Sequence, residues 1–151
     1  MAFTGNWVCT SFKTDLLSGR MNFMASGGNS FKLALYTNTA TLDATTTAYT
    51  TSGEHAVSGT YTANGKVLTV EATFPKVVSG VTSVVDFQDL TWAASTITSR
   101  GALIYNDTIT TPTADPSVVV LDFGSDKSSS SGDFTVVFPA GDTANAIIRV
   151  A

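Results

Sequence analysis

The stretch "FKLALYT" at residues 31–37 decides the fold class, because apolar side chains recur in it at every second position. Phe31, Leu33 and Leu35 would share one face of an extended strand, and the residues between them would share the other. A period of two is the pattern of a β-strand with one face turned to the core. We therefore expect a half-buried strand here.

Similar apolar or alternating segments continue along the chain, with Gly-, Ser- and Pro-rich turns between them. Counting the first, we expect about eight strands in an antiparallel β-sandwich, an all-β fold. The segments after the first lie at residues 57–63, 66–74, 81–87, 97–105, 118–123, 134–138 and 146–150.

Two turns between these strands have their own signals. Asn64-Gly65 is a strong hairpin signal because both residues tolerate positive φ, so we expect it to join 57–63 to 66–74. The run "SDKSSSSGD" at 125–133 is low in complexity and is read as a mobile hairpin loop between the two strands beside it.

The beginning of the chain differs from the rest. Val8, Phe12 and Leu16 recur at four-residue steps, which predicts a short helix over about residues 8–18, and Gly19 can end it. We expect residues 1–30 to form an N-terminal arm and this helix, and residues 31–151 to form the β-sandwich, within a single domain overall.

Charge limits the classes of partner. Only 13% of the 151 residues are charged and the formal net charge is −4, whereas about 25% is usual. Binding to nucleic acid or to an anionic membrane needs clustered Lys and Arg, and the basic residues here are scattered. The start "MAFTGNWVCTSF" lacks the pattern of a signal peptide, which predicts a chain made in the cytoplasm.

Residues suited to catalysis or metal binding are few. The single histidine, His55, is read as a surface residue rather than a catalytic base, and Cys9 as a small core residue. Asp122, Asp126 and Asp133 could gather around Ca²⁺, but aspartate also favours turns for its own hydrogen bonds. We expect no enzyme activity, no cofactor and no metal.

The connector "LDATTTAYTTSGE" at 42–54 is rich in neutral hydroxyl groups. Asp43 can cap a short helical turn over residues 44–49. The connector has too few acid–base groups for catalysis, so we predict an exposed contact loop in which Thr46, Tyr49 and Thr51 meet a partner. In the N-terminal arm, Phe3 and Trp7 are candidate interface anchors, with packing beneath the helix as the alternative.

Several stretches together resemble small virion proteins of tailed bacteriophages. The likeness covers about residues 31–150 and depends on the order and spacing of the stretches as well as on their letters. They are "FKLALYTNTATLDATTTAYTTSGE", "VVDFQDLTWAASTITSRGALIYN", "VLDFGSD" and "SSSGDFTVVFP".

The resemblance implies a structural component of a virion and favours a capsid decoration or cement protein on the capsid exterior. Its partners would be the major capsid protein and further copies of itself, in a trimer or another closed ring. A tail or head–tail connector subunit and a receptor-binding module of the tail tip are the alternatives.

Overall fold

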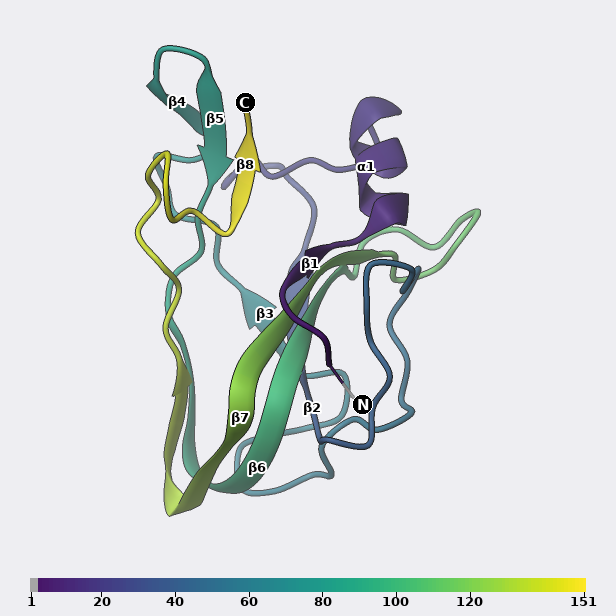
Figure 1. Cartoon of the computed structure of the whole chain (residues 1–151), viewed down its shortest axis with the longest axis vertical. Coiled ribbons are helices and arrows are strands. Elements are labelled where there is room, and N and C mark those ends of the chain that lie inside the picture. Colours follow the sequence, from purple (N-terminus) through teal and green to yellow (C-terminus); the bar gives the residue numbers. More distant parts are fainter. Residues whose placement is uncertain (1–2) are drawn as a thin grey trace.

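The computed structural model describes residues 3–151 as an antiparallel, mostly β structure with one short helix. Eight strands in this part of the chain form a five-stranded sheet and a three-stranded sheet (Figure 1). The predicted all-β, sandwich-like fold class is confirmed. The division into 1–30 and 31–151 stays a prediction, although buried residues from both ranges belong to one core cluster.

The five-stranded sheet has the order β1-β7-β6-β2-β3. Neighbouring strands in it are antiparallel, and β2 is the strand that "FKLALYT" predicts. Its strands are β1 (Trp7–Val8), β7 (Ser117–Val136), β6 (Leu90–Asn106), β2 (Phe31–Tyr36) and β3 (Lys66–Leu68).

The half-buried alternation expected for β2 is only partly right. Phe31, Leu33 and Leu35 are buried as expected, but Ala34 and Tyr36 on the other face are buried as well. The second face is covered because the 42–54 connector folds back over it, with the Tyr36 hydroxyl donating to the Thr50 carbonyl oxygen at 2.6 Å. The sheet therefore has apolar packing on both sides at β2.

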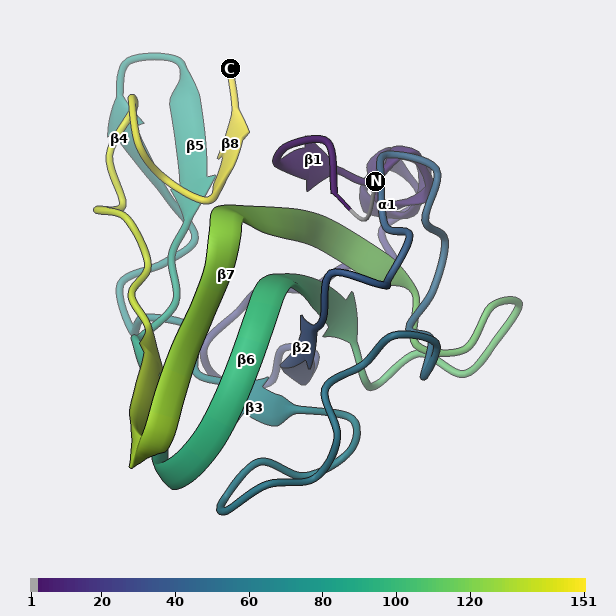
Figure 2. The same cartoon turned by 60° about the horizontal axis from the view of Figure 1, so that its bottom comes forward.

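Strands β6 and β7 form one long hairpin that bends sharply along its length (Figure 2). The pairing register shifts at several points, and two non-glycine residues there, Ala94 and Ser131, have positive φ. Such bulges bend a strand and increase its twist. Residues 102–105 and 118–121 at one end of the hairpin, and Trp92 and Phe134 towards the other, are buried in the same core.

The second sheet has three short strands in the order β4-β5-β8. They are β4 (Lys76–Ser79), β5 (Thr82–Val85) and β8 (Ile148–Val150). The predictions at 81–87 and 146–150 correspond to β5 and β8. Strand β4 was not expected, because its alternation is confined to four residues beside Pro75.

The predicted hairpin around Asn64-Gly65 is wrong. Residues 57–63 form no strand beyond a Ser58–Tyr61 bridge, and β3 pairs with β2 instead. The two turn residues do adopt the positive φ that suggested a hairpin, 74° and 70°. They lead the chain into β3 beside Leu33. The local conformation of the turn was therefore predicted, but the strand that pairs with β3 was not.

The serine run is not a hairpin loop. Residues 125–133 lie inside β7, and the segments at 118–123 and 134–138 largely belong to the same strand rather than to two antiparallel ones. The Ser129 hydroxyl accepts from the Ile97 amide at 3.3 Å and donates to the Ser95 carbonyl oxygen at 2.7 Å. Serine side chains thus complete hydrogen bonds where the bulges disturb the ladder.

Helix α1 (Thr10–Leu17) is shorter than the predicted helix, and Val8 lies in β1 instead. Phe12 is buried against Phe23, which stacks on Phe31 with ring centroids 4.3 Å apart. These three aromatic rings belong to the same core cluster as the buried side chains of the larger sheet. They join the N-terminal part of the chain to that sheet.

Candidate functional site

The connector at 42–54 is held down at many points. The Asp43 carboxylate accepts from the Thr45 amide at 2.7 Å and from the Thr45 hydroxyl at 2.6 Å, and these bonds lower the pKa of Asp43. They close a turn at residues 44–45 rather than the helical turn expected over 44–49. Hydrogen bonds then join Thr47 to Ser117 and Tyr49 to Asp115, so the connector lies against the start of β7.

Glu54 is the polar centre of this region. Its carboxylate accepts from the hydroxyl of Tyr49, from the hydroxyl of Tyr61 at 2.8 Å and from the amide of Asn64 at 2.8 Å. The Tyr105 hydroxyl donates to the Asn64 carbonyl oxygen at 2.7 Å, and its ring packs on that of Tyr49. One carboxylate thus ties the connector to the turn before β3 and, through that turn, to β6.

The four tyrosines of the chain surround the connector, and each has a raised pKa. Burial is the largest cause for all of them, and the nearby negative charge of Glu54 adds to it. A phenol with a raised pKa stays protonated at neutral pH, so these hydroxyls act as hydrogen-bond donors. This arrangement favours a structural cluster over an acid–base site.

His55 uses both ring nitrogens within the fold. Nε2 accepts from the Thr98 amide at 3.1 Å, which leaves Nδ1 to donate to the Ala56 carbonyl oxygen at 2.7 Å. The ring also packs edge-on against Tyr61. The neutral tautomer with hydrogen on Nδ1 satisfies both contacts. The imidazole therefore joins the connector to β6.

Cys9 is a core residue, as predicted. It is completely buried, and burial raises the pKa of its thiol. A buried thiol with a raised pKa is a poor nucleophile, because the thiolate is the reactive form.

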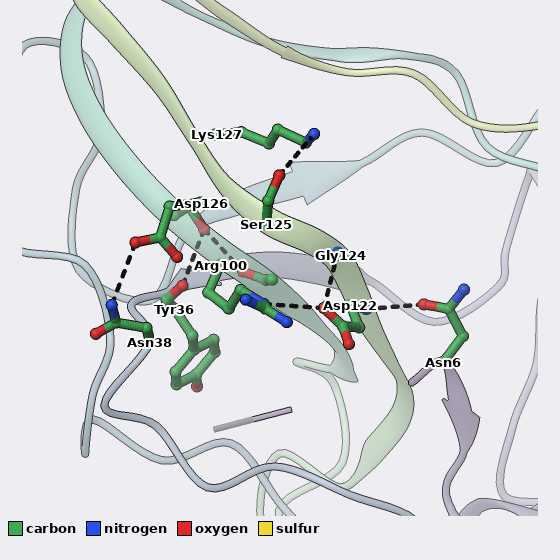
Figure 3. A network of polar contacts seen from close by, with 11 residues as sticks. Asn6, Tyr36, Asn38, Arg100, Asp122, Gly124, Ser125, Asp126 and Lys127 are labelled. Atoms are coloured by element: carbon green, nitrogen blue, oxygen red, sulfur yellow. Dashed lines mark hydrogen bonds and ion pairs between the residues drawn. The ribbon is translucent and has the colours of Figure 1, made fainter. Parts of the chain in front are cut away.

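The three aspartates considered for calcium take different partners. Asp122 pairs with Arg100 at 3.1 Å and accepts from the Gly124 amide at 2.8 Å, whereas Asp126 accepts from the Asn38 amide group at 3.2 Å (Figure 3). Asp133 accepts from the backbone of β6. Within residues 3–151, no three His, Cys, Asp or Glu side chains are grouped as metal ligands.

The five predicted contact residues do not form one surface. Phe3 is buried, with its ring against Gly101 of β6 rather than shown beneath the helix. Trp7 is 40% exposed. Thr46 and Tyr49 are half-buried and engaged in the connector, and Thr51 is exposed. The Phe3 ring is thus not exposed as an interface anchor would be, whereas partner contact by the other four residues stays a prediction.

Two cavities that the sequence did not indicate lie on either side of β8. One, of about 440 Å³, lies between β8 and the end of α1 and includes Leu16, Met24 and Val150. The other, of about 270 Å³, includes Trp7 and Ile147. The only sequence signal was apolar residues near both ends of the chain, and nothing in their spacing placed those ends together.

The chain matches no protein-family model, no curated protein and no solved structure. In the described part of the chain, no helix has the length and apolarity needed to cross a bilayer. The function is therefore inferred from the residues of this chain and their arrangement.

Proposed function

We propose that this protein is a non-enzymatic structural component of a bacteriophage virion, a decoration or cement protein on the outer surface of the capsid. The observation that carries the proposal is that its reactive side chains are occupied by the fold. His55, Cys9 and Glu54 each serve internal contacts or burial, and none is paired as a nucleophile with a base.

The exterior supports docking to another protein. Exposed threonines and serines in the connector and in β7 give a neutral, hydroxyl-rich surface. Exposed aliphatic side chains accompany them, including Val77, Val81 and Val150. Neutral groups cost less to dehydrate than charged ones, so such a surface can be buried against a partner with little penalty.

The proposed partners are the major capsid protein and further copies of this chain, in a trimer or another closed ring. Repeated weak contacts add up when linked sites bind one lattice. The net charge of −4 argues against the phosphate backbone of nucleic acid as a partner. The proposed location is the capsid exterior, after synthesis in the cytoplasm of the host bacterium.

The test is add-back to phage heads from a strain whose gene for this protein is deleted. Purified protein should sediment with these heads to saturation and should raise the temperature at which they release DNA. His55→Ala, checked for folding by circular dichroism, should bind as the natural protein does, since no chemistry at His55 is involved. Failure to sediment with the heads would contradict the proposal.

A second candidate, a receptor-binding module, is favoured by a recess of about 450 Å³ along β7. Phe123, Lys127, Asp133 and Thr135 line it, which combines an aromatic ring with hydrogen-bonding groups. Such a combination suits a surface sugar. Adhesion of the isolated protein to host cells, abolished by Phe123→Ala, would favour this candidate over decoration.

A further inference from the structure

Asn64 differs from the other asparagines of the chain. Its side chain is exposed, and its hydrogen bonds within the described residues 3–151 use only its backbone. Every other asparagine takes part in a hydrogen bond through its side-chain amide, and these residues are Asn6, Asn22, Asn29, Asn38, Asn106 and Asn145. The side-chain amide of Asn64 is therefore the one that the fold leaves free to react.

The residue after Asn64 supplies the group with which it can react. Asn64 is the only asparagine of the chain that is followed by glycine. The backbone nitrogen after an asparagine can attack the side-chain carbonyl carbon, and glycine permits the closest approach because it has no Cβ. Asn29, which precedes a serine, is the nearest rival. Its Oδ1, however, accepts from the Asn22 amide at 2.8 Å and from the Asn106 side chain at 3.0 Å.

The fold also restrains the backbone at this turn. The amide of Gly65, which contains the attacking nitrogen, donates to the Thr62 carbonyl oxygen at 3.1 Å. The Asn64 amide donates to the Glu54 carboxylate at 2.8 Å, and the Asn64 carbonyl oxygen accepts from the Tyr105 hydroxyl at 2.7 Å. These bonds hold the backbone on both sides of the reacting atoms. The nitrogen can therefore turn towards the side chain only when the turn opens locally.

We propose that Asn64 is a site of spontaneous deamidation, and that the hydrogen bonds of its backbone with Glu54 and Tyr105 set the rate. The Gly65 nitrogen forms a bond to the side-chain carbonyl carbon of Asn64. The bond from that carbon to the side-chain nitrogen breaks, and ammonia leaves with the proton that the Gly65 nitrogen gives up. Water then opens the succinimide ring to an aspartyl or an isoaspartyl residue. No electrons are transferred, and water is the only co-reactant.

The reaction would loosen the hydrogen bonds around Glu54. Either product adds a negative charge to the residue whose amide donates to the Glu54 carboxylate, and like charges repel. The isoaspartyl product also adds a carbon atom to the main chain between the amide that donates to Glu54 and the carbonyl group that accepts from Tyr105. Deamidation would thus weaken the link between the connector and β6. This inference is independent of the proposed function, because no partner takes part.

The test is incubation of the full chain in mildly alkaline buffer below its melting temperature, with modified peptides identified by mass spectrometry and isoaspartate measured enzymatically. Asn64 should be modified before any other asparagine. Glu54→Gln weakens a hydrogen bond to a charged group in the closed turn and should raise the rate about tenfold. Tyr105→Phe removes only a hydroxyl donor and should raise the rate about fivefold. Val120→Ala is the matched control, because it destabilises the core and makes none of the turn's hydrogen bonds.

The control separates local opening from global unfolding. Val120→Ala should leave the rate at Asn64 unchanged, and an increase as large as that of Glu54→Gln would overturn the role of the two hydrogen bonds. Natural-rate deamidation in both Glu54→Gln and Tyr105→Phe would overturn it as well. Earlier modification of another asparagine would contradict the assignment of the site. An unmodified Asn64 in the folded protein, under conditions that modify it in urea, would also contradict that assignment.

Discussion

The two sheets of this protein use similar residues for different purposes. In the five-stranded sheet, valine, leucine and isoleucine of β6 and β7 are buried, and Ser95 and Ser99 are buried with hydrogen bonds to the backbone. In the three-stranded sheet, Val77 and Val150 are 62% and 53% exposed. The larger sheet therefore carries most of the core, and the smaller one leaves more of its apolar side chains exposed.

The comparison teaches that composition alone does not assign a role. Valine is a core residue at position 120 and a surface residue at position 77. The difference comes from packing, since Val120 belongs to the core cluster whereas Val77, on the edge strand β4, does not. Matched substitutions in the two sheets can therefore test how much each sheet contributes to stability.

The largest contrast is expected between two glycines with positive φ. At Gly65 an added Cβ would lie 1.9 Å from the Leu33 carbonyl oxygen, whereas at Gly80, in the β4–β5 turn, nothing lies within 4 Å. Gly65→Ala should lower the free energy of unfolding by about 2–4 kcal/mol, from strain and overlap together. Gly80→Ala should cost about 1 kcal/mol, from the backbone conformation alone. Urea unfolding of both variants measures the two losses. Equal losses would contradict the expected contrast between the close contact at Gly65 and the open space at Gly80.

The next contrast compares one valine from each sheet. Val120→Ala removes methyl groups that are fully buried in the core cluster, and should cost about 2–3 kcal/mol. Val77→Ala should change stability by less than about 0.5 kcal/mol, because its side chain is exposed. Thermal unfolding of the pair is the measurement. A loss at Val77 as large as that at Val120 would show that the smaller sheet is structural.

The two glutamates of the chain form the third pair. Glu54→Gln replaces an acceptor of three hydrogen bonds by a group that must donate as well, and should cost about 1–3 kcal/mol. Glu71→Gln should be neutral or slightly stabilising, because Glu71 adds to the negative charge beside Asp86. Chemical denaturation at neutral pH separates them. A neutral Glu54→Gln would mean that the tyrosine cluster does not depend on its carboxylate.

The smallest effect is expected at Asp86, whose pKa is raised by burial and by the nearby charges of Glu71 and Asp89. A raised carboxyl pKa in the folded state contributes stability below the unfolded value of about 3.9, and this contribution is lost as the pH rises through the folded pKa. Asp86→Asn keeps the oxygen that accepts from the Phe87 amide. The free energy of unfolding of this variant, relative to that of the natural protein, should rise from acidic to neutral pH by less than about 1 kcal/mol. Melting temperatures of the variant and the natural protein across that pH range are the measurement. A difference between them that does not change with pH would contradict this role for Asp86.

Much of the fold could be predicted from local pattern. The period of two at 31–37, the four-residue spacing around Phe12 and the segments near 81–87 and 146–150 each mark an element that the structure contains. The serine run was misread because glycine and serine usually mark turns. In this chain the hydroxyl groups of Ser128 and Ser129 stabilise a bent strand, which depends on partners in β6 that lie 30 and 34 residues away in the sequence.

The candidate site was less predictable than the fold. Tyr49 was recognised as important, but its role follows from Glu54, Tyr61 and Tyr105, and their convergence is a property of the tertiary structure. The space between β1 and β8 had no local signal, because it is made by residues from opposite ends of the chain. Local periodicity reports which face of a strand is apolar and does not report which edge stays unpaired.

The most direct test of the central claim is electron microscopy of intact phage particles, with the positions of this protein counted and located. A protein that acts by docking its neutral surface on the shell should appear as many copies spread over the capsid exterior. A single ring at one vertex, or no copies on the shell at all, would contradict the account.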